Sequence, residues 1–330
     1  MSPSATPTGS TPETTTPRFG KHLLSLRDLS ADTITALLNT ADGFLEIGTR
    51  TVKKVPALRG KTVVNLFFEP STRTRTSFEL AAKRLSADVL NITVAASSVV
   101  KGETLTDTAR TIEAMNTDTV VIRHAAAGAP QLLAETLNSH VINAGDGAHE
   151  HPTQGLLDLF TIRRAKGRIE GLNVVIVGDI THSRVARSGL IGLTKLGAHV
   201  RLVAPPTMIP SGIEKLSEGP GDVTVGYDLD AALKGADVIM PLRLQLERQG
   251  APLFPGKREY ATLYGINRER MAAAAEGAIV MHPGPINRGV EIAHDVADSD
   301  QSTILSQVTH GVAVRMAVLY HYSAGQGAAA

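Results

Sequence analysis

The chain has 330 residues, 42% of them hydrophobic, and its 33 Lys and Arg residues nearly balance its 32 Asp and Glu residues. This length and composition indicate a globular protein large enough for two domains, and a net charge of +1 predicts no general binding to nucleic acid or to an anionic membrane. The absence of cysteine excludes disulfides, thiolate metal sites and cysteine nucleophiles, and it fits a cytoplasmic protein.

The N-terminal leader, residues 1–18, is rich in Ser, Thr and Pro, and we expect it to be disordered. It lacks the apolar core of a signal peptide, and no later apolar run is long enough to span a membrane. We therefore expect a cytoplasmic location and no membrane segment.

From about residue 61, short apolar runs alternate with amphipathic helical patterns. KTVVNLFF (61–68) reads as a strand, and in the following TSFELAAKRL the residues Phe78, Ala81, Ala82 and Leu85 have helical i, i+3, i+4, i+7 spacing. The pattern continues with strand DVLNITV, a loop through SSVVKGE, helix TLTDTARTIEAM, strand DTVVIRH, helix GAPQLLAETL and strand HVINAG. This alternation is typical of βαβ units and predicts a mostly parallel sheet with helices on both faces.

A second series follows a helical pattern at about 153–166. It contains strand GLNVVIVGD, helix SRVARSGLIGLTKLG, and strands HVRLVAP, ADVIMPL and GAIVMHP. A long helical pattern, STILSQVTHGVAVRMAVLYHY, comes near the end. We predict an α/β fold of two doubly wound domains, each with a mostly parallel sheet flanked by helices, with the C-terminal helix crossing back to the first domain. The expected domains are 19–152 plus 305–325, and 153–304.

Polar clusters follow six of the predicted strands. They lie at 71–75, 123–124, 146–154, 182–187, 243–245 and 282–285. Because ligands in open α/β sheets bind beyond the carboxyl ends of the strands, these clusters indicate one shared site.

The first cluster, STRTR (71–75), stands where a helix begins. Free backbone N–H groups, hydroxyls and a guanidinium at such a point suit a dianion such as phosphate. In the alternative, Ser71 or Thr72 caps the helix and the arginines are solvated; capping explains one hydroxyl but not this density of donors. We expect Glu69 to pair with one of the arginines.

Other motifs are absent or weak. The chain has no GxxxxGK[ST], Gly178 is not followed by the remaining glycines of GxGxxG, and HEH (149–151) is a weak metal signal without HExxH. We find no convincing nucleophile elbow. We therefore expect no metal and no cofactor, and direct group transfer from an acyl phosphate is the remaining chemistry.

Seven motifs, in this order, resemble the catalytic chains of aspartate carbamoyltransferases, within the aspartate/ornithine carbamoyltransferase family: FFEPSTRTRTSFE, SSVVKGETLTDT, VVIRH, NAGDGAHEHPTQGLLDLFT, GDITHSRVARS, LRLQLER and HPGPINRGVEI. The resemblance spans about Phe19 to Tyr322. It implies an enzyme of pyrimidine biosynthesis that transfers the carbamoyl group of carbamoyl phosphate to the amine of L-aspartate. The products would be N-carbamoyl-L-aspartate and phosphate, formed by direct attack through a tetrahedral intermediate, without a covalent enzyme intermediate.

The acceptor has to be chosen by other features, because ornithine carbamoyltransferases share the fold, the STRTR cradle and an HPxQ motif. The ornithine enzymes resemble one another in an HCLP motif whose cysteine helps to hold a cationic amino acid, whereas this chain has HPGP and no cysteine. Arg184 and Arg243 suit the two carboxylates of aspartate. Aspartate is favoured; ornithine or another carbamoyl acceptor, and a non-catalytic phosphate-binding protein, are the alternatives.

The resemblance also implies site residues. The carbamoyl-phosphate-binding positions match Ser71, Thr72, Arg73, Thr74, Ser97, Arg123, His151, Gln154 and Pro283. The aspartate-binding positions match Lys101, Arg184, Arg243, Gln245, Gly284 and Pro285. The catalytic positions match Arg73, Thr74, Lys101, Arg123 and His151. Gln154 and the backbone at Pro283 would orient the carbamoyl NH2 group.

Physical reasoning supports these roles. Attack places negative charge on the carbamoyl oxygen, which Thr74, Arg123 and His151 would polarise as an oxyanion hole does. Arg73 would neutralise the charge that grows on the departing phosphate. Arg187 is expected to be structural.

Assembly is implied by the SSVVKGE loop, whose family counterpart enters the neighbouring subunit's site. Ser97 and Lys101 of this loop would then complete the active site of a neighbouring chain. The resemblance therefore implies a homotrimer with active sites shared between chains. Family members also occur with regulatory chains or with dihydroorotase, and the form HPGPINRG resembles the latter. The altered spacing of this motif leaves the role of Arg288 open.

Overall fold

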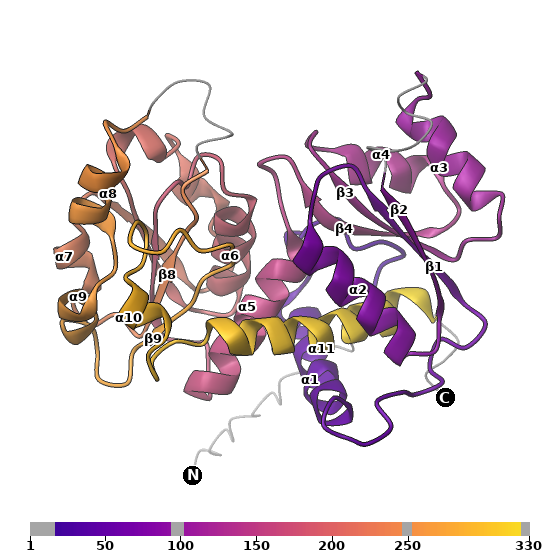
Figure 1. Ribbon diagram of the computed structural model, residues 1–330, viewed down its shortest axis with the longest axis horizontal. Helices are drawn as coiled ribbons and strands as arrows, with labels where there is room; N and C mark the ends of the chain where they lie inside the picture. Colours follow the sequence, from indigo (N-terminus) through magenta and orange to yellow (C-terminus); the bar gives the residue numbers. More distant parts are fainter. Residues whose placement is uncertain (1–16, 94–101, 246–252, 325–330) are drawn as a thin grey trace, which may run out of the picture.

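The computed structural model describes residues 17–93, 102–245 and 253–324. Two sheets lie side by side, each flanked by helices (Figure 1). The first half contains α1 (Ala31–Ile47), β1 (Thr62–Phe67), α2 (Thr72–Arg84), β2 (Asp88–Thr93), α3 (Leu105–Glu113), β3 (Thr119–His124), α4 (Ala129–Thr136), β4 (His140–Asp146) and α5 (Pro152–Lys166). The second half contains β5 (Asn173–Val177), α6 (Arg184–Lys195), β6 (His199–Val203), η3 (Pro206–Met208), η4 (Ile213–Leu216), β7 (Asp222–Gly226), α7 (Leu229–Leu233), β8 (Val238–Pro241), α8 (Lys257–Tyr264), α9 (Arg268–Ala272), β9 (Ile279–Val280), α10 (His294–Ala297) and α11 (Ile304–Ser323).

Both sheets are doubly wound. The strand orders are β2-β1-β3-β4 and β7-β6-β5-β8-β9, and the paired strands are parallel. The winding direction therefore reverses between β1 and β3 in the first sheet and between β5 and β8 in the second. Ligands of open α/β sheets bind at such reversal points, outside the carboxyl ends of the strands.

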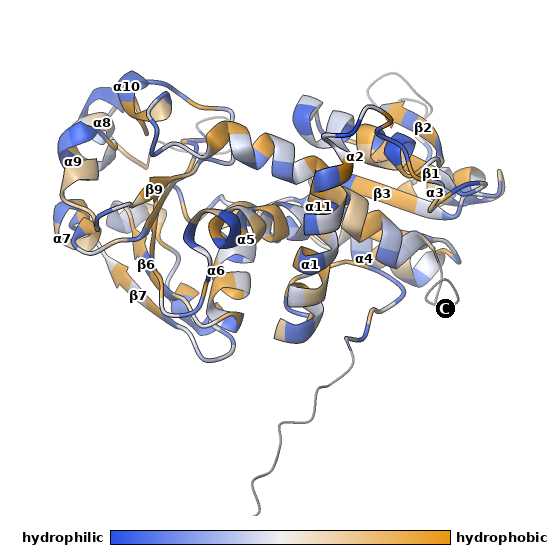
Figure 2. Ribbon diagram, turned by 90° about the horizontal axis from the view of Figure 1, so that it is seen from below, coloured by the Kyte–Doolittle hydropathy of each residue, from blue (hydrophilic) through white to orange (hydrophobic). Residues whose placement is uncertain are grey.

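The side chains of β1 show why both faces of the first sheet are covered. Val63 and Phe67 join the larger apolar cluster, whereas Val64 and Leu66 join a smaller cluster with residues of α3 and α4. Because successive side chains of a strand point to opposite faces, a run that is apolar except for Asn65 fits a strand with helices on both sides. Figure 2 shows this apolar colouring along the strands.

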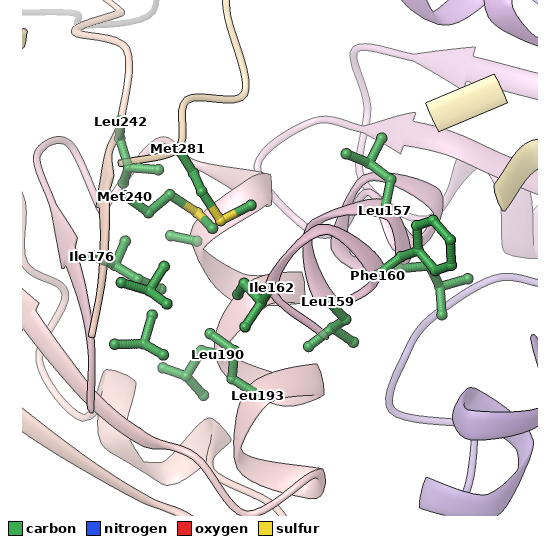
Figure 3. Packing of buried hydrophobic residues seen from close by; sticks show 14 of the residues in the cluster. Leu157, Leu159, Phe160, Ile162, Ile176, Leu190, Leu193, Met240, Leu242 and Met281 are labelled. Atoms are coloured by element: carbon green, nitrogen blue, oxygen red, sulfur yellow. The ribbon is translucent and has the colours of Figure 1, made fainter. Parts of the chain in front are cut away.

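Helices α5 and α11 connect the two halves of the molecule. α11 packs against α1, α2 and α5, so the C-terminal helix does return to the first sheet, as predicted (Figure 1). α5 packs against α6 of the second half, where Leu159 and Ile162 face Leu190 and Leu193 (Figure 3). The helices approach closely at Gly192, where a Cβ would lie only 2.8 Å from Cδ1 of Leu159.

The predicted α/β fold is confirmed, with one strand that the sequence analysis missed. β7 is an edge strand whose residues are exposed or half-buried, and its sequence, DVTVG, carries only two apolar β-formers. β9 is shorter than predicted and comprises only two residues. Among the described residues, no helix has both the length and the apolarity needed to cross a bilayer. Residues 1–16 of the predicted leader lie outside the described residues.

Candidate active site

A cavity of about 910 Å3 lies at the carboxyl ends of the strands that flank both reversal points. All six polar clusters contribute to it. The predicted site residues that line it are Ser71, Thr72, Arg73, Thr74, Arg123, His151, Gln154, Arg184, Arg243, Gln245, Pro283, Gly284 and Pro285. Ser97 and Lys101 lie outside the described residues. The structure therefore brings together every predicted site residue that it describes.

Helix α2 begins directly after β1 and presents its N-terminus to the cavity. Ser71 is the N-cap residue, but its side chain makes no capping hydrogen bond. The first intrahelical bond runs from the Arg75 N–H to the Ser71 carbonyl, at 3.2 Å. The hydroxyl of Ser71 is thus not consumed by the helix, and capping alone does not account for STRTR. A helix start with hydroxyls and a guanidinium is suited to phosphate.

Glu69 joins two of the cavity's arginines. Its Oε2 lies 3.1 Å from Nε of Arg123 and 2.7 Å from Nη2 of Arg184. Glu69 follows β1 and Arg123 lies near the end of β3, both in the first sheet, whereas Arg184 belongs to the second half. The cluster therefore crosses the cavity. Glu69 was expected to pair with an arginine of STRTR, whereas these two ion pairs join it to arginines of other segments.

Arg184 is the first residue of α6, where the helix dipole disfavours a cation. Glu69 supplies a compensating anion, and the Gly147 carbonyl accepts a hydrogen bond from Nη1 at 3.3 Å. Gly145 has φ +114°, and a Cβ there would lie 2.8 Å from Nε of Arg184. A glycine at this position therefore allows the guanidinium to approach the backbone.

His151 is the N-cap residue of α5 and is buried. Its backbone N–H donates to Oγ of Ser188 at 2.9 Å, and that hydroxyl donates to Oε2 of buried Glu150 at 2.9 Å. Burial, and then the charges of three neighbouring arginines, lower the pKa of the His151 imidazole well below its usual value. The ring is therefore neutral at pH 7, and one of its nitrogens can donate a hydrogen bond.

The segment 282–285 reaches the first half of the molecule at Arg73. Gly284 has φ +62°, and a Cβ built on it would lie 2.7 Å from Cζ of Arg73. The Gly284 N–H donates to Nδ1 of His282 at 2.8 Å, and Nε2 of His282 faces Oε1 of fully buried Glu291 at 3.3 Å. A buried carboxylate and imidazole thus support the loop that contacts Arg73.

Arg243 and Gln245 follow β8 and line another wall of the cavity, while Leu244 between them is buried. Nε2 of Gln245 donates to the His182 carbonyl at 3.4 Å. Burial, followed by the charge of Arg243, lowers the pKa of the Arg73 guanidinium. Both of these effects disfavour the charged form of Arg73, and an anion placed between the two arginines would relieve them.

The described lining of the cavity has a large excess of positive charge. Its guanidiniums belong to Arg73, Arg123, Arg184, Arg243 and Arg315, and its carboxylate belongs to Glu69. The described residues contain no group of three or more His, Asp and Glu side chains that could hold a metal ion. The cavity is therefore suited to ligands that carry several anionic groups.

Arg315 and Gln307, which were not predicted, also line the cavity, as does His282, which belongs to the predicted cluster 282–285 but was not named as a site residue. Arg315 is buried on α11, its Cζ lies 5.2 Å from the centroid of the Phe78 ring, and Nη1 donates to the Gly311 carbonyl at 3.0 Å. An arginine within the apolar run VAVRMAVL was the available signal, because arginine is rarely buried without a partner or a role.

Two nearby arginines have structural partners. Arg187 donates to the carbonyls of Ala148 and Thr181, in agreement with its expected structural role. Arg288 contacts both carboxylate oxygens of Asp298 at 2.7 Å and does not line the cavity. Its visible role is therefore to hold a surface turn.

Two family models match the chain in succession. The aspartate/ornithine carbamoyltransferase carbamoyl-P binding domain matches residues 21–164, and the Asp/Orn binding domain matches residues 170–322. The chain therefore belongs to the aspartate/ornithine carbamoyltransferase family.

Relatives in this family are similar over nearly the whole chain. The aspartate carbamoyltransferase catalytic subunit of Geobacter sulfurreducens is 63% identical over 93% of this chain and 97% of its own length. That of Pelotomaculum thermopropionicum is 60% identical over 93% and 98%.

Solved structures of the family share the fold. Aspartate transcarbamoylase from Trypanosoma cruzi in complex with carbamoyl phosphate and aspartate has a TM-score of 0.83 at 33% identity, covering 92% of this chain and 96% of that one. Ornithine carbamoyltransferase from Pyrococcus furiosus has a TM-score of 0.84 at 32% identity, covering 94% and 99%. The fold thus does not distinguish the two acceptors, whereas both relatives described above, at 63% and 60% identity, are aspartate carbamoyltransferase catalytic subunits.

Proposed function

We propose that this chain transfers the carbamoyl group of carbamoyl phosphate to L-aspartate and releases N-carbamoyl-L-aspartate, an intermediate of pyrimidine biosynthesis, and phosphate. The observation that carries this proposal is the single cavity in which an α2 N-terminus and five guanidiniums from both halves of the molecule meet. The named activity of the relatives at 60–63% identity supports the choice of reaction. We further propose that 19–152 plus 305–325 binds carbamoyl phosphate and that 153–304 binds aspartate.

The carbamoyl phosphate site is proposed at the start of α2. Backbone N–H groups and hydroxyls from Ser71 to Thr74 would hold the phosphate, and Arg73 would neutralise the charge that grows on it as the bond to the carbamoyl carbon breaks. Ser97, from the loop outside the described residues, would complete this cradle.

The carbamoyl oxygen is proposed to face Thr74, Arg123 and His151. When the aspartate amine attacks the carbonyl carbon, this oxygen becomes an oxyanion, and preorganised donors stabilise that charge more than they stabilise the substrate. A neutral imidazole suits this task, because it donates a hydrogen bond without adding a further cation among the arginines.

Aspartate is proposed to bind between Arg184 and Arg243, with Gln245, Lys101 and the backbone at Gly284 and Pro285 as further contacts. Each of the two guanidiniums can donate a pair of parallel hydrogen bonds to one carboxylate. Arg184 also pairs with Glu69 at 2.7 Å, so a bound carboxylate would share the guanidinium with that side chain or displace it.

The direct test is an acceptor assay. Purified protein supplied with carbamoyl phosphate should form carbamoyl aspartate from L-aspartate and little product from L-ornithine. Turnover with ornithine alone would assign the chain to the other branch of the family. A lack of turnover with both acceptors, while carbamoyl phosphate still binds, would indicate a non-catalytic phosphate-binding protein.

We also propose that the working unit is a homotrimer in which Ser97 and Lys101 enter the site of a neighbouring chain. Mixing inactive Arg73→Ala and Lys101→Ala proteins after reversible dissociation should then restore part of the activity, because some sites receive both intact residues. Hybrids that exchange chains yet stay inactive would rule out shared sites. Co-purification with a regulatory chain and with dihydroorotase would test whether either is a further partner.

A further inference from the structure

A buried carboxylate, Asp158, lies behind two side chains that line the cavity. It belongs to α5, one turn after Gln154, and is 2% exposed. Its Oδ1 accepts hydrogen bonds from Nε2 of Gln154 at 3.1 Å and from Nε2 of Gln307 at 2.7 Å. Both glutamines line the cavity, whereas Asp158 does not. The hydrogen bonds of this acid reach the cavity through the two amides.

The contact with Asp158 fixes which end of the Gln154 amide faces the cavity. A side-chain amide has an NH2 donor at one end and a carbonyl acceptor at the other, and a carboxylate oxygen can only accept. The NH2 end of Gln154 must therefore face Asp158. The carbonyl end makes no hydrogen bond with a described residue and is left for a ligand.

Gln307 links Asp158 to the backbone at His282. Its Nε2 donates to Asp158, and its Oε1 accepts from the backbone N–H of His282 at 2.9 Å. Both ends of this amide are thus occupied, and its orientation is fixed. His282 directly precedes Pro283, so a single carboxylate oxygen holds both groups assigned above to the carbamoyl NH2 group.

We propose that Asp158 is a positioning residue that makes the site selective for a carbamoyl donor over an acetyl donor. It holds the carbonyl of Gln154, and through Gln307 the backbone at Pro283, as acceptors for an NH2 group. The inference rests on the proposed function, in which carbamoyl phosphate is the donor. Acetyl phosphate carries the same phosphate but has a methyl group in place of NH2. Acceptors that meet a methyl group lose their partners, and such a site rejects the analogue strongly.

The surroundings of Asp158 indicate which substitution preserves its role. Oδ2 has no hydrogen-bond partner among the described residues, and burial raises the pKa of the carboxyl to about 7 against the opposing effects of Gln307, Gln154 and Arg315. When the carboxyl is protonated, the hydrogen belongs on Oδ2, because Oδ1 accepts from both glutamines; Oδ1 is therefore an acceptor in either state. Asp158→Asn reproduces this arrangement, with its amide oxygen at the place of Oδ1. Asp158→Leu has a similar shape but removes the acceptor.

The test compares kcat/KM for carbamoyl phosphate and for acetyl phosphate, each at saturating aspartate. Relative to the wild type, Asp158→Leu should lower the carbamoyl-to-acetyl ratio by about a hundredfold, because Gln154 is then free to turn its amide. Asp158→Asn should keep the ratio within about threefold of the wild type. Gln154→Leu should also lower the ratio, and adding Asp158→Leu to it should lower the ratio further only by the roughly tenfold expected of the Gln307 link, because the effect on Gln154 is already lost.

Two results would overturn the inference. In the first, Asp158→Leu slows both donors equally, as a general packing defect would. In the second, Asp158→Asn loses selectivity as fully as Asp158→Leu. If the leucine variant does not fold, Gln307→Met serves instead: it cuts only the link to 282–283 and should lower the ratio by about tenfold, with no change counting against the inference. A wild-type protein without turnover on carbamoyl phosphate and aspartate would instead contradict the proposed function.

Discussion

At the residue scale, the arginines of the cavity differ in what balances their charge. Arg123 and Arg184 share the carboxylate of Glu69, whereas Arg73 makes no ion pair with a described residue and faces the charge of Arg243. The charge of Arg73 is thus not balanced by a carboxylate of the described residues. Helix α2 places this guanidinium beside the proposed phosphate site, where an anionic ligand would balance it.

Replacement of Arg73 should therefore affect the chemical step most. We expect Arg73→Ala to lower kcat by a factor of about 100 to 1,000, the loss typical when one preorganised donor to a developing charge is removed. Arg75→Ala is the matched control, because Arg75 lies on the same helix but does not line the cavity. Steady-state kinetics of both variants would check this, and equal losses would contradict the assignment.

His151 should remain uncharged across the physiological pH range. Its folded pKa is depressed by burial and by the neighbouring arginines, whereas the unfolded ring takes up a proton near pH 6.5. The unfolded state thus binds more protons below pH 6.5, and this group lowers the stability of the fold as the pH falls below that value. NMR of labelled imidazoles, assigned with His151→Asn, should show no titration of this ring between about pH 6 and 8. A midpoint near the ordinary histidine value would contradict the account.

At the element scale, the sequence predicted the strands and helices that surround the cavity. Strand β1 was recognisable because helices cover both of its faces, which favours a nearly continuous apolar run, here broken only by Asn65. Edge strand β7 was missed because its exposed position tolerates Asp, Thr and Gly. Periodicity reports burial, so an element that buries little leaves a weak signal.

Contacts between distant segments were the part of the site that the sequence could not provide. The six clusters were expected at one site because parallel strands end at a common edge. By contrast, no local pattern indicates that Gly284 lies against Arg73, or that Asp158, Gln307 and His282 form one chain of hydrogen bonds. These contacts depend on how α11 and the second sheet pack on the first half.

The contact at Gly284 can be tested by adding one methyl group. Gly284→Ala would bring a Cβ against the guanidinium of Arg73 and should lower kcat/KM at least tenfold, roughly the effect of misplacing one catalytic donor. Gly289→Ala is the control, because Gly289 also has positive φ (+78°) but its nearest neighbour would be 3.9 Å away. Both variants should lose about 1 kcal/mol of stability from backbone strain. Equal activity in the two variants would contradict the role of this contact.

At the scale of the whole molecule, the two sheets place their reversal points against one cavity. Strands β1 and β3 supply Glu69, the start of α2 and Arg123, while β5 and β8 lead to Arg184 and Arg243. Each half alone offers an incomplete set of cations. Glu69 connects Arg123 of the first half with Arg184 of the second, and substrates bound between the halves are expected to add to that connection.

The central claim is that the two substrates bind together between the halves, phosphate on α2 and carboxylates on Arg184 and Arg243. A crystal structure with N-(phosphonacetyl)-L-aspartic acid, which the Trypanosoma cruzi enzyme binds, tests this most directly. The phosphonate should lie at the N-terminus of α2 beside Arg73, with the aspartate carboxylates on Arg184 and Arg243. A ligand bound away from this cavity, or one whose carboxylates contact neither arginine, would contradict the account.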